Sequence, residues 1–365
     1  MQDADLDATV SAHEEAVRSA RENSIDRAMY RANLGVSLMA RGQRSGSVKD
    51  FEAAIREQEA AAAEIPQASQ EYVRVLAGLA DSLAARSLMA DSRADIQQAQ
   101  AAYRAAATAG LERLPEQAIG SAHNWGSWAT VRESFPEAAE AYGYGLQAME
   151  QLFRTQLTRA HKETWLRDAQ GLPARAAYAR AKSGDVPGAV EAMERGRALL
   201  LSEALQRDRA DMERLAQTDR ADLKDRYEAA AWRWNQLSRA GDAAIMPEPG
   251  TSRAPTPTGE ALAEDLRRPK GDLDAAIAQI RMVPGYERFF LPSTFPGIVA
   301  DAGGDPLVYL GATEAGGFAL IVRPAGAAAE AVWLPGLTDE ALAGAALWDF
   351  CGYTLKVFGG SRSWH

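Results

Sequence analysis

The first 239 or so residues carry apolar side chains at spacings of three and four, in a stretch that is poor in proline and rich in alanine, leucine, arginine and glutamate. This spacing is typical of amphipathic helices, and these residue types are good helix formers. The sequence therefore predicts that this part of the chain is almost entirely helical, beginning with one helix within residues 1–25.

The same order of small and large residues recurs along the helical stretch. The first set is Asn33-Leu34-Gly35, Leu38, Gly42, Ser47, Phe51 and Ala54; the second is Asn124-Trp125-Gly126, Ala129, Glu133-Ser134, Ala138, Tyr142 and Gly145; the third is Ala176-Ala177, Arg180, Gly184, Ala189, Met193 and Gly196. Small residues let two antiparallel helices approach closely, a large residue fills the groove between them, and a glycine ends the first helix. Because one such pair cannot bury its apolar face alone, several pairs are expected to stack.

A fourth set starts at Leu79 and reaches Ala99, Tyr103 and Ala106 only if its turn holds about seven extra residues. Together the sets resemble the tetratricopeptide repeat family over residues 26–206. Their spacing is irregular, because the equivalent residues Leu34, Leu79, Trp125 and Ala176 are 45, 46 and 51 residues apart, against about 34 in the standard unit. The resemblance implies a solenoid of helical hairpins, which a connecting helix over residues 207–240 extends.

A repeat solenoid offers a concave groove that is lined mainly by the first helix of each pair. The residues near the reference triplets that are expected to face it are Arg74, His123, Ser127, Tyr178 and Lys182. For each of them a solvated helix face is the alternative. The ligand predicted for this groove is a protein or a peptide.

The composition changes at residues 241–259, where four prolines stand among glycine, serine and threonine. Proline continues neither a helix nor a central strand, so this segment is predicted to be a linker. A helix is expected over residues 260–281, with a possible break at 269–271, and a second one from Thr338 onward. Between them the apolar period changes to two, which predicts strands. The strands are expected over residues 306–313, 317–323 and 329–334.

The order of these segments resembles the start of a CHAT domain, a caspase-like peptidase domain that follows tetratricopeptide repeats. The runs that carry the resemblance are Glu194–Leu201, Ile280–Leu291, Asp305–Leu310, Gly316–Val322 and Val332–Thr338. It implies that residues 260–365 form the N-terminal part of an α/β cysteine peptidase domain. In that family a thiolate attacks the peptide carbonyl while an imidazole assists proton transfer.

The catalytic pattern of that family is absent from this sequence, because the chain has no His-Gly dipeptide. Its single cysteine, Cys351, lies at helical spacing from Leu347 and Leu355, which is typical of a small buried residue rather than a nucleophile. His161 belongs to the helical array and His365 is the last residue. No catalytic residue is therefore assigned, and the α/β domain is expected to be incomplete.

Several classes of function conflict with the composition. One cysteine and four scattered histidines exclude a disulfide framework and argue against a metal centre, and no cofactor is predicted. A net charge of −10 argues against nucleic-acid binding. No apolar run long enough to span a membrane and no signal peptide are recognisable, so a cytoplasmic protein is expected.

The combined interpretation is a mainly α protein, a tetratricopeptide-like solenoid followed by a small, incomplete caspase-like α/β domain. Its expected function is to serve as the sensor and scaffold half of a CHAT-type protease system. The alternative is a non-enzymatic adaptor whose α/β module is unrelated to peptidases. Trp232 and Trp234 are two residues apart on one helix and cannot both face inward, so one of them is expected to mark a contact with the C-terminal part or with a partner.

Overall fold

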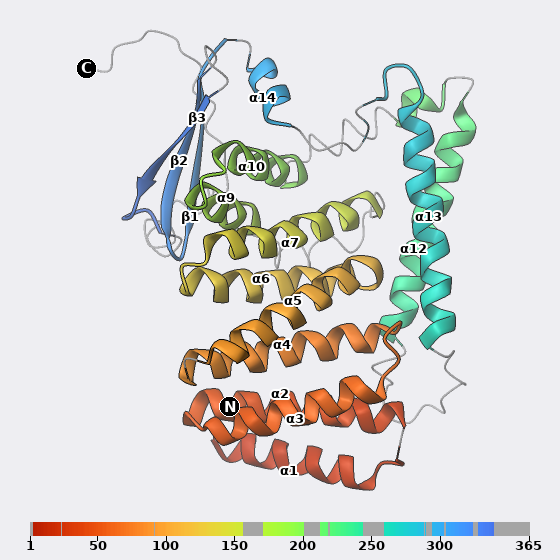
Figure 1. Ribbon diagram of the computed structural model, residues 1–365. Helices are drawn as coiled ribbons and strands as arrows, with labels where there is room; N and C mark the ends of the chain where they lie inside the picture. The colour runs from red at the N-terminus through yellow and green to blue at the C-terminus, as the bar shows by residue number, and fades with distance from the viewer. Residues whose placement is uncertain are drawn as a thin grey trace. The chain divides into compact units, whose positions relative to one another are not determined.

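The computed structural model describes residues 3–22, 24–90, 92–155, 171–200, 212–217, 220–243, 259–287, 289, 294–302, 304–323 and 328–338. These residues form a long series of helices followed by a small sheet (Figure 1). The chain divides into two compact units. The first unit consists of Met1–Trp125 and Trp232–Gly271, and the second of Gly126–Ala231 and Asp272–His365.

The helices follow the amphipathic pattern of the sequence. Their bounds are α1 (Asp3–Ser19), α2 (Ile25–Ser45), α3 (Val48–Glu64), α4 (Gln70–Ala90), α5 (Arg93–Arg113), α6 (Pro115–Val131), α7 (Phe135–Thr155), α9 (Leu172–Lys182), α10 (Val186–Leu200), α12 (Ala221–Ala243), α13 (Gly259–Arg281) and α14 (Phe295–Asp301). Consecutive helices pack as hairpin-like pairs, α2 with α3, α4 with α5 and α9 with α10. The prediction of a mainly helical chain built from such pairs is confirmed.

Two of these pairs share a polar connection that the register of small residues did not reveal. Arg41 of α2 donates to both carboxylate oxygens of Asp50 at 3.0 and 2.7 Å, and Arg86 of α4 does the same to Asp95 at 2.8 and 2.6 Å. Each aspartate lies in the first turn of the second helix, where negative charge is favoured. The two ion pairs are 45 residues apart, so the same bidentate contact joins the helices of both pairs.

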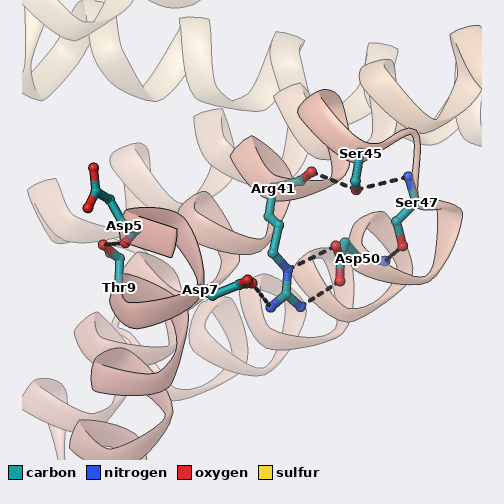
Figure 2. A network of polar contacts seen from close by, with 7 residues as sticks. All are labelled: Asp5, Asp7, Thr9, Arg41, Ser45, Ser47 and Asp50. Carbon is teal, nitrogen blue, oxygen red and sulfur yellow. Dashed lines mark hydrogen bonds and ion pairs between the residues drawn. The ribbon is translucent and has the colours of Figure 1, made fainter. Parts of the chain in front are cut away.

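The connection extends to α1 in the first unit. Figure 2 shows the guanidinium of Arg41 between Asp50 of α3 and Asp7 of α1, to which it donates at 3.1 Å. In the same turn the hydroxyl of Ser47 accepts from the backbone N–H of Asp50 and caps α3. A cap and an ion pair thus meet at one aspartate and connect α1, α2 and α3.

Two of the predicted turns need correction. Gly42 lies inside α2, which continues to Ser45 and ends at Gly46 with a φ of 70°. The turn of the fourth set is also not enlarged, because α4 ends at Ala90 and α5 begins at Arg93. The α2–α3 and α4–α5 connections are equally short, and in each of them a serine, Ser47 or Ser92, caps the start of the second helix. The turns predicted at Glu133 (φ 57°) and at Gly184 (φ 90°) are confirmed.

Small residues do lie where the paired helices approach most closely. A Cβ atom added at Gly126 of α6 would lie 2.3 Å from the ring of Tyr142 on α7. One added at Gly196 of α10 would lie 2.3 Å from the side chain of Pro173 on α9. The predicted small-to-large packing between the two helices of a pair is therefore present in the second unit.

The sheet belongs to the second unit and contains β1 (Leu307–Thr313), β2 (Gly316–Arg323) and β3 (Ala328–Leu334). The strands pair antiparallel in the order β1-β2-β3, with Tyr309 opposite Leu320 and Phe318 opposite Trp333. The three predicted strands are confirmed to within two residues. Burial alternates along β1, so one face of this strand contacts the helices.

The segment between the helical pairs and the sheet contains α12, α13 and α14. The second half of α13 packs against α12 through Tyr227, Ile277 and Ile280, all of them buried. α13 runs without a break through Pro269, so the possible interruption at 269–271 does not occur. On α12 the side chain of Trp234 is 1% exposed and that of Trp232 is 62% exposed, as expected for two indoles on opposite faces.

Several predictions lie partly or wholly outside the described residues. Of the predicted linker 241–259, residues 244–258 are not described, while Gly241–Ala243 belong to α12 and Gly259 begins α13. The helix predicted from Thr338 onward lies almost entirely outside the described residues. The same holds for Cys351, His161 and His365. The predicted domain boundaries stay predictions.

Replacing Gly126 by alanine should lower the free energy of unfolding by about 2 kcal/mol, because the buried ring of Tyr142 leaves no space for a methyl group. Gly143 of α7 is the matched control, since a Cβ atom there meets no atom within 4 Å. Gly143→Ala should raise stability by up to about 1 kcal/mol through helix propensity. Urea unfolding followed by far-ultraviolet circular dichroism measures both, and equal midpoints for the two variants would contradict the packing described above.

Candidate functional site

A cavity of about 360 Å³ lies in the second unit, where the end of α6, α7, α9 and the turn between β1 and β2 meet. Its lining consists of Ser127, Thr130, Val131, Tyr142, Arg175, Tyr178, Thr313, Glu314 and Ala315. Two other cavities lie in the first unit. One is lined by residues of α5 alone, and the other by the Arg41–Asp50 pair and its neighbours. Only the first of the three gathers polar side chains from both helices and strands.

The cavity exists because the β1–β2 turn is held against α9. The Nε of Arg175 donates to Glu314 at 3.0 Å, and a second nitrogen of the guanidinium contacts the other carboxylate oxygen. The hydroxyl of Tyr178 donates to the carbonyl of Ala315 at 3.1 Å. The side chain of Arg175 is 13% exposed and that of Glu314 is 65% exposed, so the carboxylate reaches in from the solvent side. These contacts close one wall of the cavity.

The other polar groups of the lining are hydroxyls. The hydroxyls of Ser127 and Tyr142 lie 3.4 Å apart. Thr130 donates to the carbonyl of Gly126, one turn earlier in its own helix. A serine, threonine or tyrosine hydroxyl both donates and accepts hydrogen bonds, so this side of the cavity accommodates either kind of group on a ligand.

The two tyrosines of the cavity stay neutral at physiological pH. Burial raises the pKa of the Tyr142 hydroxyl above its ordinary value. Burial also raises the pKa of Tyr178, and the negative charge of Glu133 raises it further. Neutral phenols, one guanidinium and one carboxylate form a set suited to hydrogen-bonded recognition of a polar ligand.

A second set of contacts fixes the sheet to α10. The hydroxyl of Tyr309, which is fully buried on β1, donates to Glu194 at 2.5 Å, and Arg197 donates to the other oxygen of this carboxylate at 2.9 Å. Burial and the nearby charge of Glu194 raise the pKa of Tyr309. Glu191 accepts from the backbone N–H of Phe295 at the start of α14. The hairpin of α9 and α10 therefore supports the sheet, and we call this hairpin the platform of the sheet.

The structure brings together some of the predicted groove residues. Ser127 and Tyr178 line the cavity, and the ammonium of Lys182 lies 5.4 Å from the ring centroid of Tyr178. Arg74 on α4 and His123 on α6 are half-buried and belong to the first unit. The structure therefore does not place them in one site with Ser127, Tyr178 and Lys182.

Sequence reasoning missed Arg175 and Glu314. The two residues are 139 positions apart, and only the docking of the turn on α9 brings them together. A signal did exist for the structural pair Arg41–Asp50, because its nine-residue spacing recurs 45 residues later at Arg86–Asp95.

The described residues contain no group of three or more histidine, cysteine, aspartate or glutamate side chains that could hold a metal ion. Among the helices within the described ranges, none has the length and apolarity that crossing a membrane requires.

A half-buried carboxylate in the first unit forms a separate polar cluster. Asp81 of α4 accepts from the hydroxyl of Tyr103 on α5 at 2.6 Å and from the side-chain amide of Asn124 on α6 at 3.2 Å. Burial raises the pKa of Asp81, although both hydrogen bonds oppose the shift. The ring of Tyr103 stacks on Trp125, with centroids 6.0 Å apart. Asn124, a reference residue of the predicted repeat, therefore helps to join the hairpins of the first unit.

The raised pKa of Asp81 has a consequence for stability. Because the folded chain holds this proton more tightly than the unfolded chain, Asp81 stabilises the fold most below its unfolded pKa of about 4 and loses that contribution as pH rises through the folded value. Asp81→Asn does not titrate, so its stability relative to the wild type should increase from pH 4 to pH 7. Urea midpoints across this range test it, with the exposed Asp305→Asn as control. If the stability of Asp81→Asn relative to the wild type stayed constant or fell with rising pH, the raised pKa of Asp81 would be contradicted.

Comparison with known proteins assigns no family and no function to this chain. No family model matches the chain, and neither a curated protein nor a solved structure matches it. The resemblances to tetratricopeptide repeats and to CHAT domains therefore rest on the sequence motifs alone.

Proposed function

We propose that this chain is a protein-recognition scaffold that binds an extended peptide segment of a partner at the cavity between α6, α7, α9 and the β1–β2 turn. The observation that carries the proposal is the convergence of Ser127, Arg175, Tyr178 and Glu314 on one space from segments far apart in the sequence. A cavity of about 360 Å³ falls within the usual size of ligand sites.

The chemistry of the lining matches a peptide backbone. An extended peptide presents alternating N–H donors and C=O acceptors about 3.3 Å apart. The hydroxyls of Ser127 and Tyr142 serve either kind of group, and the carboxylate of Glu314 accepts hydrogen bonds. Val131 at the edge of the cavity is largely exposed, and it offers an apolar surface to a ligand side chain.

The scaffold around the cavity supports the same proposal. Repeated helical hairpins present neighbouring surfaces in a fixed order, and proteins built in this way characteristically bind extended ligands. The position of the β1–β2 turn adds specificity, because the Arg175–Glu314 pair and the Tyr178–Ala315 hydrogen bond shape one end of the cavity. Binding contributions of Arg74 and His123 stay predictions.

We extend the proposal to a CHAT-type caspase-like protease system, in which this chain supplies the sensor and scaffold half in the cytoplasm. The extension rests on the motif Glu194–Leu201 and on the order of the strand segments after it. Glu194 itself carries the hydrogen bond that fixes Tyr309, so this motif coincides with the platform of the sheet.

Filling the cavity tests the peptide-binding proposal. Peptides are selected from a random library against the full chain, and their Kd values are measured by fluorescence polarisation. Thr130→Trp places a large ring in the cavity and should weaken binding by about tenfold or more, because the ring excludes ligand atoms. Leu88→Trp, at an exposed position of α4, is the control. Equal affinities for the two folded variants would refute the proposed site.

A thiol-directed activity probe tests the division of roles within the protease system. We expect no labelling of this chain that depends on Cys351, since the sequence lacks the His-Gly dipeptide of an active peptidase. The comparison is between the wild type and Cys351→Ala after incubation with the probe and mass spectrometry. Labelling that disappears in Cys351→Ala would show instead that the chain carries a reactive thiolate of its own.

A further inference from the structure

Three aromatic rings surround the ammonium group of Lys182 in the second unit. The Nζ atom lies 3.9 Å from the ring centroid of Trp333 on β3, 5.4 Å from that of Tyr178 on α9 and 6.0 Å from that of Phe135 on α7. All three distances are within the range of cation–π attraction, which extends to about 6 Å. We name Phe135, Tyr178 and Trp333 the aromatic cage.

The rings of the aromatic cage form walls rather than a stack. The planes of Tyr178 and Trp333 are inclined by 74° with centroids 5.4 Å apart, and those of Phe135 and Tyr178 by 67° with centroids 6.2 Å apart. The Nζ atom of Lys182 lies over each of the three rings, so their electron-rich faces border a shared space, as in aromatic sites for ammonium ligands. The three rings come from a helix start, a helix and a strand, so tertiary structure alone creates the cage.

A negatively charged residue, Glu133, precedes the cage in the chain. Glu133 occupies the turn just before Phe135, and its backbone has a φ of 57°. Its negative charge contributes, after burial, to the raised pKa of Tyr178. A carboxylate beside aromatic faces increases the attraction for a cation.

The present occupant of the cage is held weakly. Lys182 ends α9, and its side chain is exposed. A primary ammonium is strongly hydrated. The attraction between an exposed ammonium and an aromatic ring is only slightly larger than the hydration energy that the ammonium loses. A methylated ammonium loses less hydration on entering an aromatic site, so it competes well for the same position.

We infer that the aromatic cage is a binding site for a quaternary ammonium group, which enters as Lys182 moves out into solvent. Trimethylated lysine on a peptide is one source of this group, and a choline headgroup is the other. The peptide source rests on the proposed function: Tyr178 belongs to both the cage and the cavity, so a peptide in the cavity can place such a side chain in the cage.

The first test uses tetramethylammonium as the probe and follows the indole N–H signals of the full chain by NMR. Trp333→Phe identifies the signal of the cage. We expect saturable shifts of this signal, and about threefold or greater tightening in Lys182→Ala, which removes the internal competitor. Trp333→Ala and Phe135→Leu should each weaken binding, whereas Trp232→Ala, at an exposed tryptophan of the first unit, should not. Unchanged affinity in Lys182→Ala would overturn the inference and leave Lys182 a structural contact of β3.

The second test compares ligands that differ only at the terminal group. Peptides selected for the cavity carry trimethyllysine, lysine or the uncharged isostere with a tert-butyl group, and phosphocholine vesicles form a separate arm. The trimethyllysine peptide should bind about threefold or more tightly than the neutral isostere, because cation–π attraction requires the charge. Equal binding of these two peptides would overturn the inference. Preferential binding of the vesicles would support it with the headgroup as the source.

The two proposals fail in different ways. One outcome is that peptides bind at the cavity with affinities that change neither on lysine methylation nor in Trp333→Ala. In that case the cage inference is wrong and the proposed function stands. If tetramethylammonium binds and tightens in Lys182→Ala while no selected peptide responds to Thr130→Trp, the cage stands and the proposed function is wrong.

Discussion

The side chain of Tyr178 holds the second unit together at the point where its helices meet its sheet. The hydroxyl donates to the carbonyl of Ala315 in the β1–β2 turn, and the ring packs against Phe318 and Trp333 of the sheet and Phe135 of α7. Burial keeps the phenol neutral, so it donates this bond at every physiological pH. Both candidate ligand sites use this residue as a shared wall, and their geometry depends on the turn that it anchors.

The sheet docks on the hairpin of α9 and α10 through two contacts that each pair a largely buried side chain with a charged partner. Arg175 pairs with Glu314 at one end of β1, and Tyr309 donates to Glu194 further along the strand. Hydrogen bonds to charged groups are stronger than neutral ones, and a buried partner left alone is costly. One contact on β1 and one in the turn after it hold the strand against α10 and α9, and this docking gives the cavity a defined shape.

Much of the fold follows from local pattern. The spacing of apolar residues located the helices, and alternation located β1 to β3 to within two residues, because both periods are properties of the backbone. The contact of Gly126 with Tyr142 was also foreseeable, since a small residue facing a large one is a local requirement of close helix packing. The end of α2 at Gly46 and the equally short α2–α3 and α4–α5 connections were missed, because the cap at Gly46 and the N-cap serines Ser47 and Ser92 mark them and the spacing of small residues does not.

The sequence alone determined a mainly helical chain of hairpin-like pairs, a three-strand module after it, and Ser127, Tyr178 and Lys182 as residues of interest. Local periodicity encodes all of these, since each depends on neighbours a few positions away. Only the tertiary structure decided that Arg175 meets Glu314, that Trp333 reaches Lys182, and that the β1–β2 turn closes a cavity. Such contacts join residues more than a hundred positions apart, and they exist because buried surface on α9 and β1 is complementary in shape and charge, a property that no local spacing carries.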